Sequence, residues 1–300
     1  MKGIVLRSVG SSYDILGTDG TLLKARLKGK FKLEDKKLTN PIAVGDEVIC
    51  IKEGSDTSEA IIDTILPRRN YIIRASPHKT EHSHLIATNI DLAILVASLV
   101  YPETSYGFID RFLLAAESFE INAALVLNKI DLYDKDIMQK ASHIKELYTQ
   151  LDYPVYLVSA THNEGIDALK RELKDKKTLF SGHSGVGKSS LLNALDVNIT
   201  QKTLPISNFA NKGVHTTTFA EMFPIEGNTF FIDTPGIKEF GLYEIERSEI
   251  SHFFPEMRRF LGNCKFNSCM HINEPGCVII EKLKSGEIAQ SRYKSYLSML

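Results

Sequence analysis

The stretch Gly182-His-Ser-Gly-Val-Gly-Lys-Ser189 decides the fold, because it has the pattern G-x-x-x-x-G-K-[ST]. A short apolar run, 178–181, precedes it and a helix-like run, 190–195, follows it, so a strand enters the loop and a helix leaves it. Glycines allow the backbone N–H groups to turn toward a phosphate, and the helix directs its positive end at the same anion. Lys188 would reach the outer phosphates and Ser189 would offer its hydroxyl to Mg²⁺. The predicted phosphate-binding residues are Gly182, Ser184, Gly185, Val186, Gly187, Lys188, Ser189 and Ser190.

Strand-like and helix-like runs alternate in the sequence before this loop. We expect strands at 92–97, 123–127 and 155–158, and helices at about 107–119, 134–151 and 165–173. This alternation predicts a parallel sheet covered by helices, whose ligand lies beyond the carboxyl ends of the strands. Between the N-terminal part of the chain and this sheet, residues 67–77 have a proline at each end and are interpreted as a linker. Residues 78–84 contain three histidines, which we interpret as a polar loop with RNA contact as one option rather than as a metal site.

Two of the expected strands end in residues suited to reading a guanine base. Asn128-Lys-Ile-Asp131 follows the strand at 123–127, and Ser159-Ala160 follows the strand at 155–158. A carboxylate at Asp131 can accept two hydrogen bonds from guanine, which adenine cannot supply, and the stem of Lys129 can lie along the purine face. Asn128 can serve both the base oxygen and its neighbouring loop, and a backbone N–H at Ser159-Ala160 can meet the same oxygen. An ordinary helix start capped by Asp131 is the alternative.

Two further segments follow the phosphate loop in the chain. Asp233-Thr-Pro-Gly236 ends an apolar run, where the aspartate can hold the water shell of Mg²⁺ and Gly236 can sense a γ-phosphate. The run Thr216-Thr-Thr218 offers a hydroxyl ligand for Mg²⁺, for which we expect Thr217. Ile237 stands where Ras-like enzymes carry a water-orienting glutamine, so another group must help hydrolysis. His215 is the nearest candidate in sequence, with a partner-supplied group or a plain loop residue as the alternatives.

Together these segments are the signature elements of a GTPase, but their order is changed. The base-reading residues come first, and the phosphate loop, threonine run and aspartate segment follow. The usual order begins with the phosphate loop and ends with base recognition, so the sequence predicts a circular permutation. The segment after Gly236 therefore continues into the C-terminal part of the chain, to which the nucleotide state can be passed through the covalent connection.

The C-terminal part contains the pattern C-x₄-C-x-H-x₅-C. Three thiolates and one imidazole suit a tetrahedral Zn²⁺ in a structural site without an open position. Three buried thiols without metal are the alternative, which would not require the histidine. We expect amphipathic helices at about 248–261 and 281–300 on either side, joined by the metal. The predicted zinc ligands are Cys264, Cys269, His271 and Cys277.

The first 67 residues contain five short apolar runs separated by turn residues. They lie at 3–6, 13–16, 22–27, 46–51 and 60–65, and the segment Gly17-Thr-Asp-Gly20 is expected to form a hairpin turn. Five short strands without a helix predict a small OB-like β-barrel, with an SH3-like barrel as the alternative. Between Thr21 and Asn40 seven Lys or Arg residues accompany two acidic ones, which suits a nucleic-acid backbone or a solvated loop.

Composition restricts the class of protein. The 300-residue chain has a formal net charge of −1, so it is not a basic nucleic-acid binder as a whole. No apolar run approaches the roughly 18 residues of a membrane span, and the N-terminus lacks the pattern of a signal peptide. We therefore expect no membrane partner. We also expect a monomer and a multi-domain α/β protein. The expected domains are a barrel at 1–67, a circularly permuted P-loop GTPase at 68–240 and a helical zinc-binding domain at 241–300.

This order of domains and motifs resembles the ribosome small subunit-dependent GTPase A family. The likeness covers essentially the whole chain and includes Gly107-Phe-Ile-Asp-Arg-Phe-Leu-Leu-Ala-Ala-Glu117, the His-Thr-Thr-Thr run at 215–218 and Glu274-Pro-Gly-Cys277. The resemblance implies a cytoplasmic bacterial enzyme that hydrolyses GTP to GDP with Mg²⁺ and acts late in maturation of the small (30S) ribosomal subunit. It also implies that the subunit stimulates hydrolysis, and that the barrel and zinc domain contact 16S rRNA.

Overall fold

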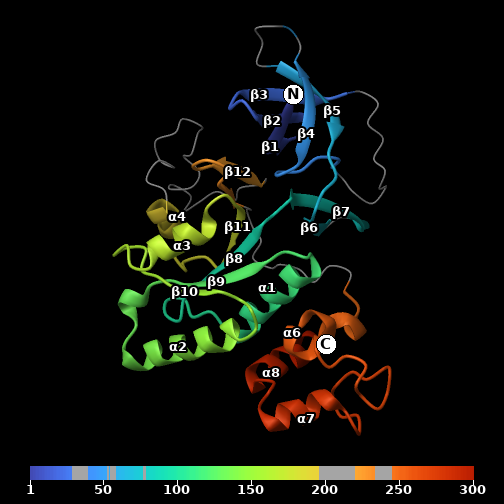
Figure 1. Cartoon of the computed structure of the whole chain (residues 1–300), viewed down its shortest axis with the longest axis vertical. Helices are drawn as coiled ribbons and strands as arrows, with labels where there is room; N and C mark the ends of the chain where they lie inside the picture. The colour runs from blue at the N-terminus through green and yellow to red at the C-terminus, as the bar shows by residue number, and fades with distance from the viewer. Residues whose placement is uncertain (29–39, 53, 55–58, 77–78, 196–219, 234–244) are drawn as a thin grey trace.

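The computed structural model describes residues 1–28, 40–52, 54, 59–76, 79–195, 220–233 and 245–300, with the backbone alone for 74–76 and 79–83. A barrel that contains the N-terminus lies at one end of the molecule in Figure 1, and a helix-covered sheet follows it. The C-terminal helices pack beside that sheet on the side of α1. In the described part of the chain, no helix has the length and apolar character needed to cross a membrane.

The barrel is built from the five strands that the sequence predicts. They are β1 (Lys2–Val9), β2 (Ser12–Gly17), β3 (Leu22–Leu27), β4 (Glu47–Lys52) and β5 (Glu59–Ile65). The strands follow the order β1-β2-β3-β5-β4, and β4 pairs again with β1 to close the barrel. Alternate residues such as Val5, Ile15 and Ile62 point into its core and are fully buried. The closed five-stranded order confirms the OB-like prediction.

A hairpin lies where the sequence was interpreted as a linker and a polar loop, so that interpretation was wrong. Strands β6 (Tyr71–Ser76) and β7 (Lys79–Thr88) form a separate two-stranded antiparallel sheet. Two asparagines hold its base. Asn70 forms hydrogen bonds in both directions with the backbone of Ile90 at 2.9 and 2.8 Å, and the Asn89 amide oxygen accepts from the Arg69 N–H at 2.9 Å. The flanking prolines hid this signal because proline usually interrupts strands.

The central sheet has the neighbour order β10-β9-β8-β11-β13-β12. Five strands run parallel, and β12 pairs antiparallel with β13. The strand of the phosphate loop, β11, therefore lies between the first strand of the domain and the last, as a circular permutation requires. The strands are β8 (Leu92–Ala97), β9 (Ala123–Leu127), β10 (Val155–Leu157), β11 (Lys177–Ser181), β12 (Glu221–Pro224) and β13 (Phe230–Asp233).

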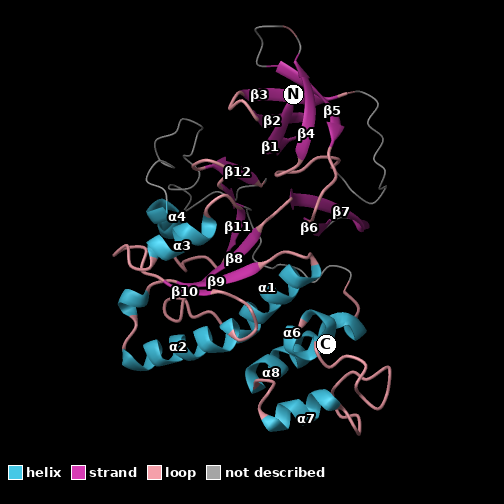
Figure 2. Ribbon diagram, in the orientation of Figure 1, coloured by secondary structure: helices cyan, strands magenta, loops and turns pink. Residues whose placement is uncertain are grey.

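Helices cover both faces of this sheet (Figure 2), which explains why its strands are continuously apolar. On β8, Ala93, Leu95 and Ala97 pack toward α1 (Tyr106–Ser118) and α2 (Lys135–Thr149), in one buried cluster. The intervening residues of β8 pack toward α3 (Ile166–Leu173) and α4 (Lys188–Leu195), in a second cluster. The period of two along each strand thus divides the core into two layers.

Strand β12 was not predicted, and it joins the central sheet to the barrel. Its Glu221 is opposite Arg7 of β1, so the two sheets form one continuous surface of strands. The four-residue strand is too short for its periodicity to be recognised in sequence.

The C-terminal region is helical, with boundaries that differ from those expected. The run at 248–261 is divided into a 3-10 helix, η2 (Arg247–Phe253), and a short helix, α6 (Pro255–Arg258), because proline starts a new helix there. The second expected helix is α7 (Val278–Ser285) and α8 (Gln290–Met299), separated at Gly286 with φ +84°. A buried cluster that includes Leu114 of α1 joins these helices to the central domain.

Candidate functional site

The phosphate loop connects β11 to α4 with the glycines that its shape requires. Gly182, Gly185 and Gly187 have φ values of +153°, +86° and +90°. A Cβ atom at Gly182 would lie 2.3 Å from the Val96 carbonyl oxygen, so a side chain is excluded there. Val186 is fully buried, whereas Ser184, Ser189 and Ser190 are exposed at the carboxyl edge of the sheet. The loop is therefore anchored by one apolar residue and presents its polar ones outward.

Lys188 and Asp233 meet at this edge, although 45 residues separate them. The Lys188 Nζ donates to Asp233 Oδ1 at 3.0 Å, and both side chains are about a quarter exposed. Ser189 lies next to Lys188 at the start of α4. The donor set of one hydroxyl and one carboxylate fits Mg²⁺, which prefers oxygen ligands and retains several waters. Three other predicted residues, His215, Thr217 and Gly236, lie outside the described part of the chain.

Asn128 connects the phosphate loop to the loop after β10. Its Nδ2 donates to the Val186 carbonyl at 3.0 Å, and its Oδ1 accepts from the Ala160 N–H at 3.2 Å. The side chain is 2 % exposed, so it has little capacity left for a ligand. The sequence assigned Asn128 to both the base oxygen and its neighbouring loop, and this geometry supports the contact with the neighbouring loop.

Lys129 forms a second connection. Its backbone has φ +67°, and its Nζ donates to the carbonyl oxygens of Gly185 at 2.6 Å and Tyr101 at 2.5 Å. The lysine therefore joins the phosphate loop to the loop before α1, and its aliphatic stem spans the space between them.

Asp131 lies in the short 3-10 helix η1 (Ile130–Leu132), and its carboxylate is oriented by Ser159. The Ser159 hydroxyl donates to Asp131 Oδ1 at 2.5 Å, and this hydrogen bond lowers the pKa of Asp131 below its usual value. The group stays ionised at neutral pH and can accept two N–H donors. His162, which the sequence analysis missed, places its Nδ1 3.8 Å from Asp131 Oδ2 and 3.2 Å from the Ser159 hydroxyl.

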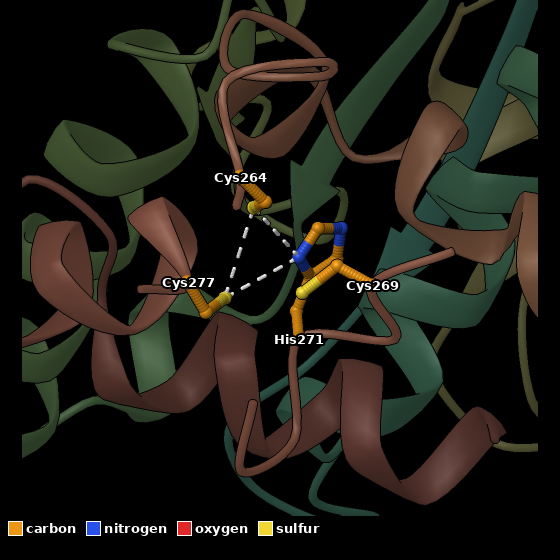
Figure 3. A group of neighbouring side chains, drawn as sticks. All are labelled: Cys264, Cys269, His271 and Cys277. Carbon is orange, nitrogen blue, oxygen red and sulfur yellow. Dashed lines mark hydrogen bonds between the residues drawn. The ribbon is translucent and has the colours of Figure 1, made fainter. Parts of the chain in front are cut away.

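The four residues predicted to bind zinc converge (Figure 3). Their ligand atoms all lie within 4.8 Å of one another. The Cys264 and Cys277 Sγ atoms are 4.0 Å apart, and they lie 3.6 and 3.4 Å from His271 Nδ1. A tetrahedral zinc ion, with bonds of about 2.3 Å to sulfur and about 2.0 Å to nitrogen, separates its ligand atoms by roughly 3.5–3.8 Å. The Cys₃His cluster is compatible with a zinc site.

The protonation of this cluster also suits a metal. Burial lowers the pKa of His271, which favours the neutral imidazole that ligates metals. Burial raises the pKa values of the Cys269 and Cys277 thiols, so a metal that binds there releases their protons.

Glu274 shapes the loop that carries these ligands, a role that the sequence analysis did not assign. Its carboxylate accepts from the backbone N–H groups of Met270, Ile272 and Asn273 at 2.7, 2.7 and 3.0 Å. Burial alone would raise the pKa of Glu274, but the backbone hydrogen bonds outweigh it and lower the pKa. A carboxylate within a short loop between metal ligands is a signal that could have identified this residue.

Comparisons with known proteins agree with this arrangement. The family model described as RsgA GTPase matches residues 65–243, and the model described as RsgA N-terminal domain matches residues 2–62. The "Small ribosomal subunit biogenesis GTPase RsgA" of Bacteroides fragilis is 48% identical over 300 residues, which cover 100% of this chain and 96% of that protein. The relative of the same name from Cytophaga hutchinsonii is 49% identical over 300 residues, which cover 100% of this chain and 98% of that protein.

Two solved structures share the fold over nearly the whole chain. YjeQ from Thermotoga maritima has 34% sequence identity and a TM-score of 0.80, covering 99% of this chain and 96% of that one. YloQ, described as a circularly permuted GTPase, has 28% identity and a TM-score of 0.77, covering 99% of this chain and 93% of that one. The sheet order, the phosphate loop and these likenesses define a circularly permuted GTPase. More narrowly, the chain belongs to the RsgA GTPase family.

Proposed function

We propose that this protein hydrolyses GTP to GDP and phosphate and assists late maturation of the small ribosomal subunit in the cytoplasm. The observation that carries the proposal is the likeness, over the full chain, to relatives named small ribosomal subunit biogenesis GTPase. The barrel and the zinc-cluster domain would contact 16S rRNA, for which the basic residues of the barrel give local support. The protein would act as a monomer.

The described residues divide into three roles at the carboxyl edge of the sheet. Gly182 to Ser190 would hold the phosphates, with Lys188 on the outer ones. Asp131 would read the guanine edge, assisted by Ser159 and the Ala160 N–H, while Asn128 and Lys129 hold the surrounding loops together. Such positioning is most of what phosphoryl transfer asks of a protein.

Mg²⁺, when bound, neutralises charge that develops on the phosphates. Among the described residues, Ser189 and Asp233 would hold it, and Thr217 is the proposed third contributor. Gly236 would respond to the γ-phosphate, and His215 would orient the attacking water in place of the glutamine that Ile237 replaces.

Phosphate release measured with and without purified small subunits tests this function. We expect slow turnover of GTP alone and strong stimulation by subunits, with His215→Ala reducing the stimulated rate and leaving GTP affinity intact. Asp131→Asn is a matched variant for base reading, because it should shift preference from guanosine to xanthosine nucleotides. If small subunits stimulate turnover neither in the wild-type protein nor in His215→Ala, a second candidate function is favoured, that of a GTP-dependent RNA-binding assembly factor with little turnover. The presence of Ile237 in place of a water-orienting glutamine is the observation behind this second candidate.

We also propose that the Cys₃His cluster binds one structural zinc ion. The spacing of the Cys264, His271 and Cys277 ligand atoms supports this, and four protein ligands leave no open position for catalysis. Metal analysis of purified protein should give about one zinc per chain, and Cys269→Ser should lower that ratio. A zinc content near zero in the unmodified protein would refute the proposal.

A further inference from the structure

Helix α1 contacts the phosphate loop at its N-terminal end. The ring of Phe108, in its first turn, stacks on the ring of His183 with centroids 3.7 Å apart and planes inclined by 29°. The loop just before the helix is joined to the same site, because Lys129 links the carbonyl oxygens of Tyr101 and Gly185. Any displacement of the start of α1 must therefore disturb the phosphate loop.

The same helix is fixed to the C-terminal domain by a buried ion pair. Asp110, two residues after Phe108, is fully buried and accepts from Arg292 Nη1 of α8 at 2.6 Å. The same guanidinium donates to both carboxylate oxygens of Glu256 at 2.6 and 3.1 Å and lies over the ring of Phe254 at 4.5 Å. A planar guanidinium held on three sides is fixed in orientation, so it ties α8 to α1.

Helix α8 also holds the loop of the predicted zinc ligands. The Tyr293 hydroxyl donates to the His271 carbonyl at 2.7 Å, and the Tyr296 hydroxyl donates to the Met270 carbonyl at 2.7 Å. Contacts therefore run without interruption from the cysteine cluster through α8 and Arg292 to α1 and the phosphate loop. Every step lies in described residues, and none uses the chain connection between 234 and 244.

We propose that Arg292 is a positioning residue for the nucleotide site. By locking α1 to the C-terminal domain, it holds Phe108 against His183, so that docking of that domain and the nucleotide affinity of the phosphate loop are coupled. A partner that loosens or tightens the C-terminal domain would change nucleotide binding through this helix. The inference rests on the proposed nucleotide binding and not on stimulation by ribosomal subunits.

The test measures GDP affinity of the zinc-loaded full-length protein in a double-mutant cycle. Phe108→Leu removes the ring stack but keeps apolar volume, and we expect about three- to tenfold weaker GDP binding. Arg292→Lys keeps the charge but cannot bridge Asp110 and Glu256, so GDP binding should weaken in the same direction. In the Phe108→Leu background the Arg292→Lys effect should fall below about twofold.

Arg258→Met is the matched control. Arg258 also joins the C-terminal domain to α1, but at the far end of the helix, where its Nη1 donates to Glu117 at 2.8 Å in an exposed pair. Loss of this exposed ion pair should leave the GDP affinity within about twofold of the wild-type value. If Arg292→Lys loses zinc or unfolds, Asp110→Asn replaces it in the cycle, since the amide oxygen still accepts one hydrogen bond.

Three results would overturn the proposal. The first is unchanged GDP affinity in a folded Arg292 or Asp110 variant. The second is an equal effect of that variant on GDP affinity in the wild-type and Phe108→Leu backgrounds, because the effects of uncoupled sites are additive. The third is an equal effect of Arg258→Met, which would indicate general loosening of the domain. A wild-type protein that binds no GDP would instead refute the proposed function, and this inference with it.

Discussion

Substitution of two glycines in the phosphate loop separates backbone strain from steric conflict. Gly185 and Gly187 have nearly the same left-handed φ, +86° and +90°, so alanine at either position costs about 1–2 kcal/mol in backbone energy. Their surroundings differ. A Cβ at Gly185 would meet Pro102 Cδ at 3.4 Å, an ordinary contact, whereas a Cβ at Gly187 would lie 2.4 Å from Asn128 Nδ2.

Gly187→Ala must therefore displace the Asn128 amide. That amide makes the two hydrogen bonds, to Val186 and from Ala160, that join the phosphate loop to the base-reading loop. Each hydrogen bond is worth about 0.5–1.5 kcal/mol, so Gly187→Ala should lose about 1–3 kcal/mol more of the nucleotide-binding free energy than Gly185→Ala. At 1.4 kcal/mol per tenfold, this corresponds to roughly 5- to 150-fold weaker nucleotide binding than in Gly185→Ala.

Titration of a fluorescent GDP analogue against both variants measures this difference, with thermal unfolding as the check that each remains folded. A third variant, Asn128→Ala, should reproduce most of the extra loss, because it removes the same two hydrogen bonds. The reasoning fails if the two alanine variants bind GDP equally, or if Asn128→Ala binds as well as wild type.

Two further predictions concern zinc retention and stability. Glu274→Gln should weaken zinc retention in a competition with a chelator, because an amide accepts the three backbone N–H groups less strongly than a carboxylate. Asp46→Ala should lower the free energy of unfolding by about 3–5 kcal/mol in a urea titration. The Arg68 guanidinium donates to the Asp46 carboxylate at 2.7 and 2.8 Å, and the substitution leaves it without this buried partner. A loss below about 1 kcal/mol would contradict the prediction.

The sequence predicted those parts of the fold in which local pattern and tertiary packing agree. Strand β8 is apolar throughout because both of its faces are covered, and its type and limits were predicted correctly. The two strands of the hairpin β6–β7 were missed because prolines flank β6 and proline usually interrupts strands, and β12 was missed because four residues are too few to show a period. In both cases pairing with a partner strand, which is not visible in a single sequence, decides the structure.

The candidate site was predictable where one short motif carries the chemistry. Gly187 and Asp131 belong to such motifs, and the structure places both at the carboxyl edge of the sheet. Contacts between distant segments were not predictable. The motif allowed Asn128 to contact a neighbouring loop but did not identify Val186 as its partner, and nothing in the sequence indicated that Arg292 reaches Asp110 across 182 positions.

Circular permutation explains why the contact between Arg292 and Asp110 can matter for the nucleotide site. In the usual order of a GTPase, the segment after the aspartate switch returns directly into the sheet through the strand that corresponds to β8. Here the chain leaves Asp233 for the C-terminal domain, so that covalent connection to β8 and α1 is cut. The C-terminal domain then packs on α1, and the buried ion pair restores by contact the link that the permutation removed from the chain. In the proposed role of Arg292, both sides of this connection reach the phosphate loop. Asp233 contacts Lys188 directly, and the C-terminal domain reaches His183 through Asp110 and Phe108 of α1.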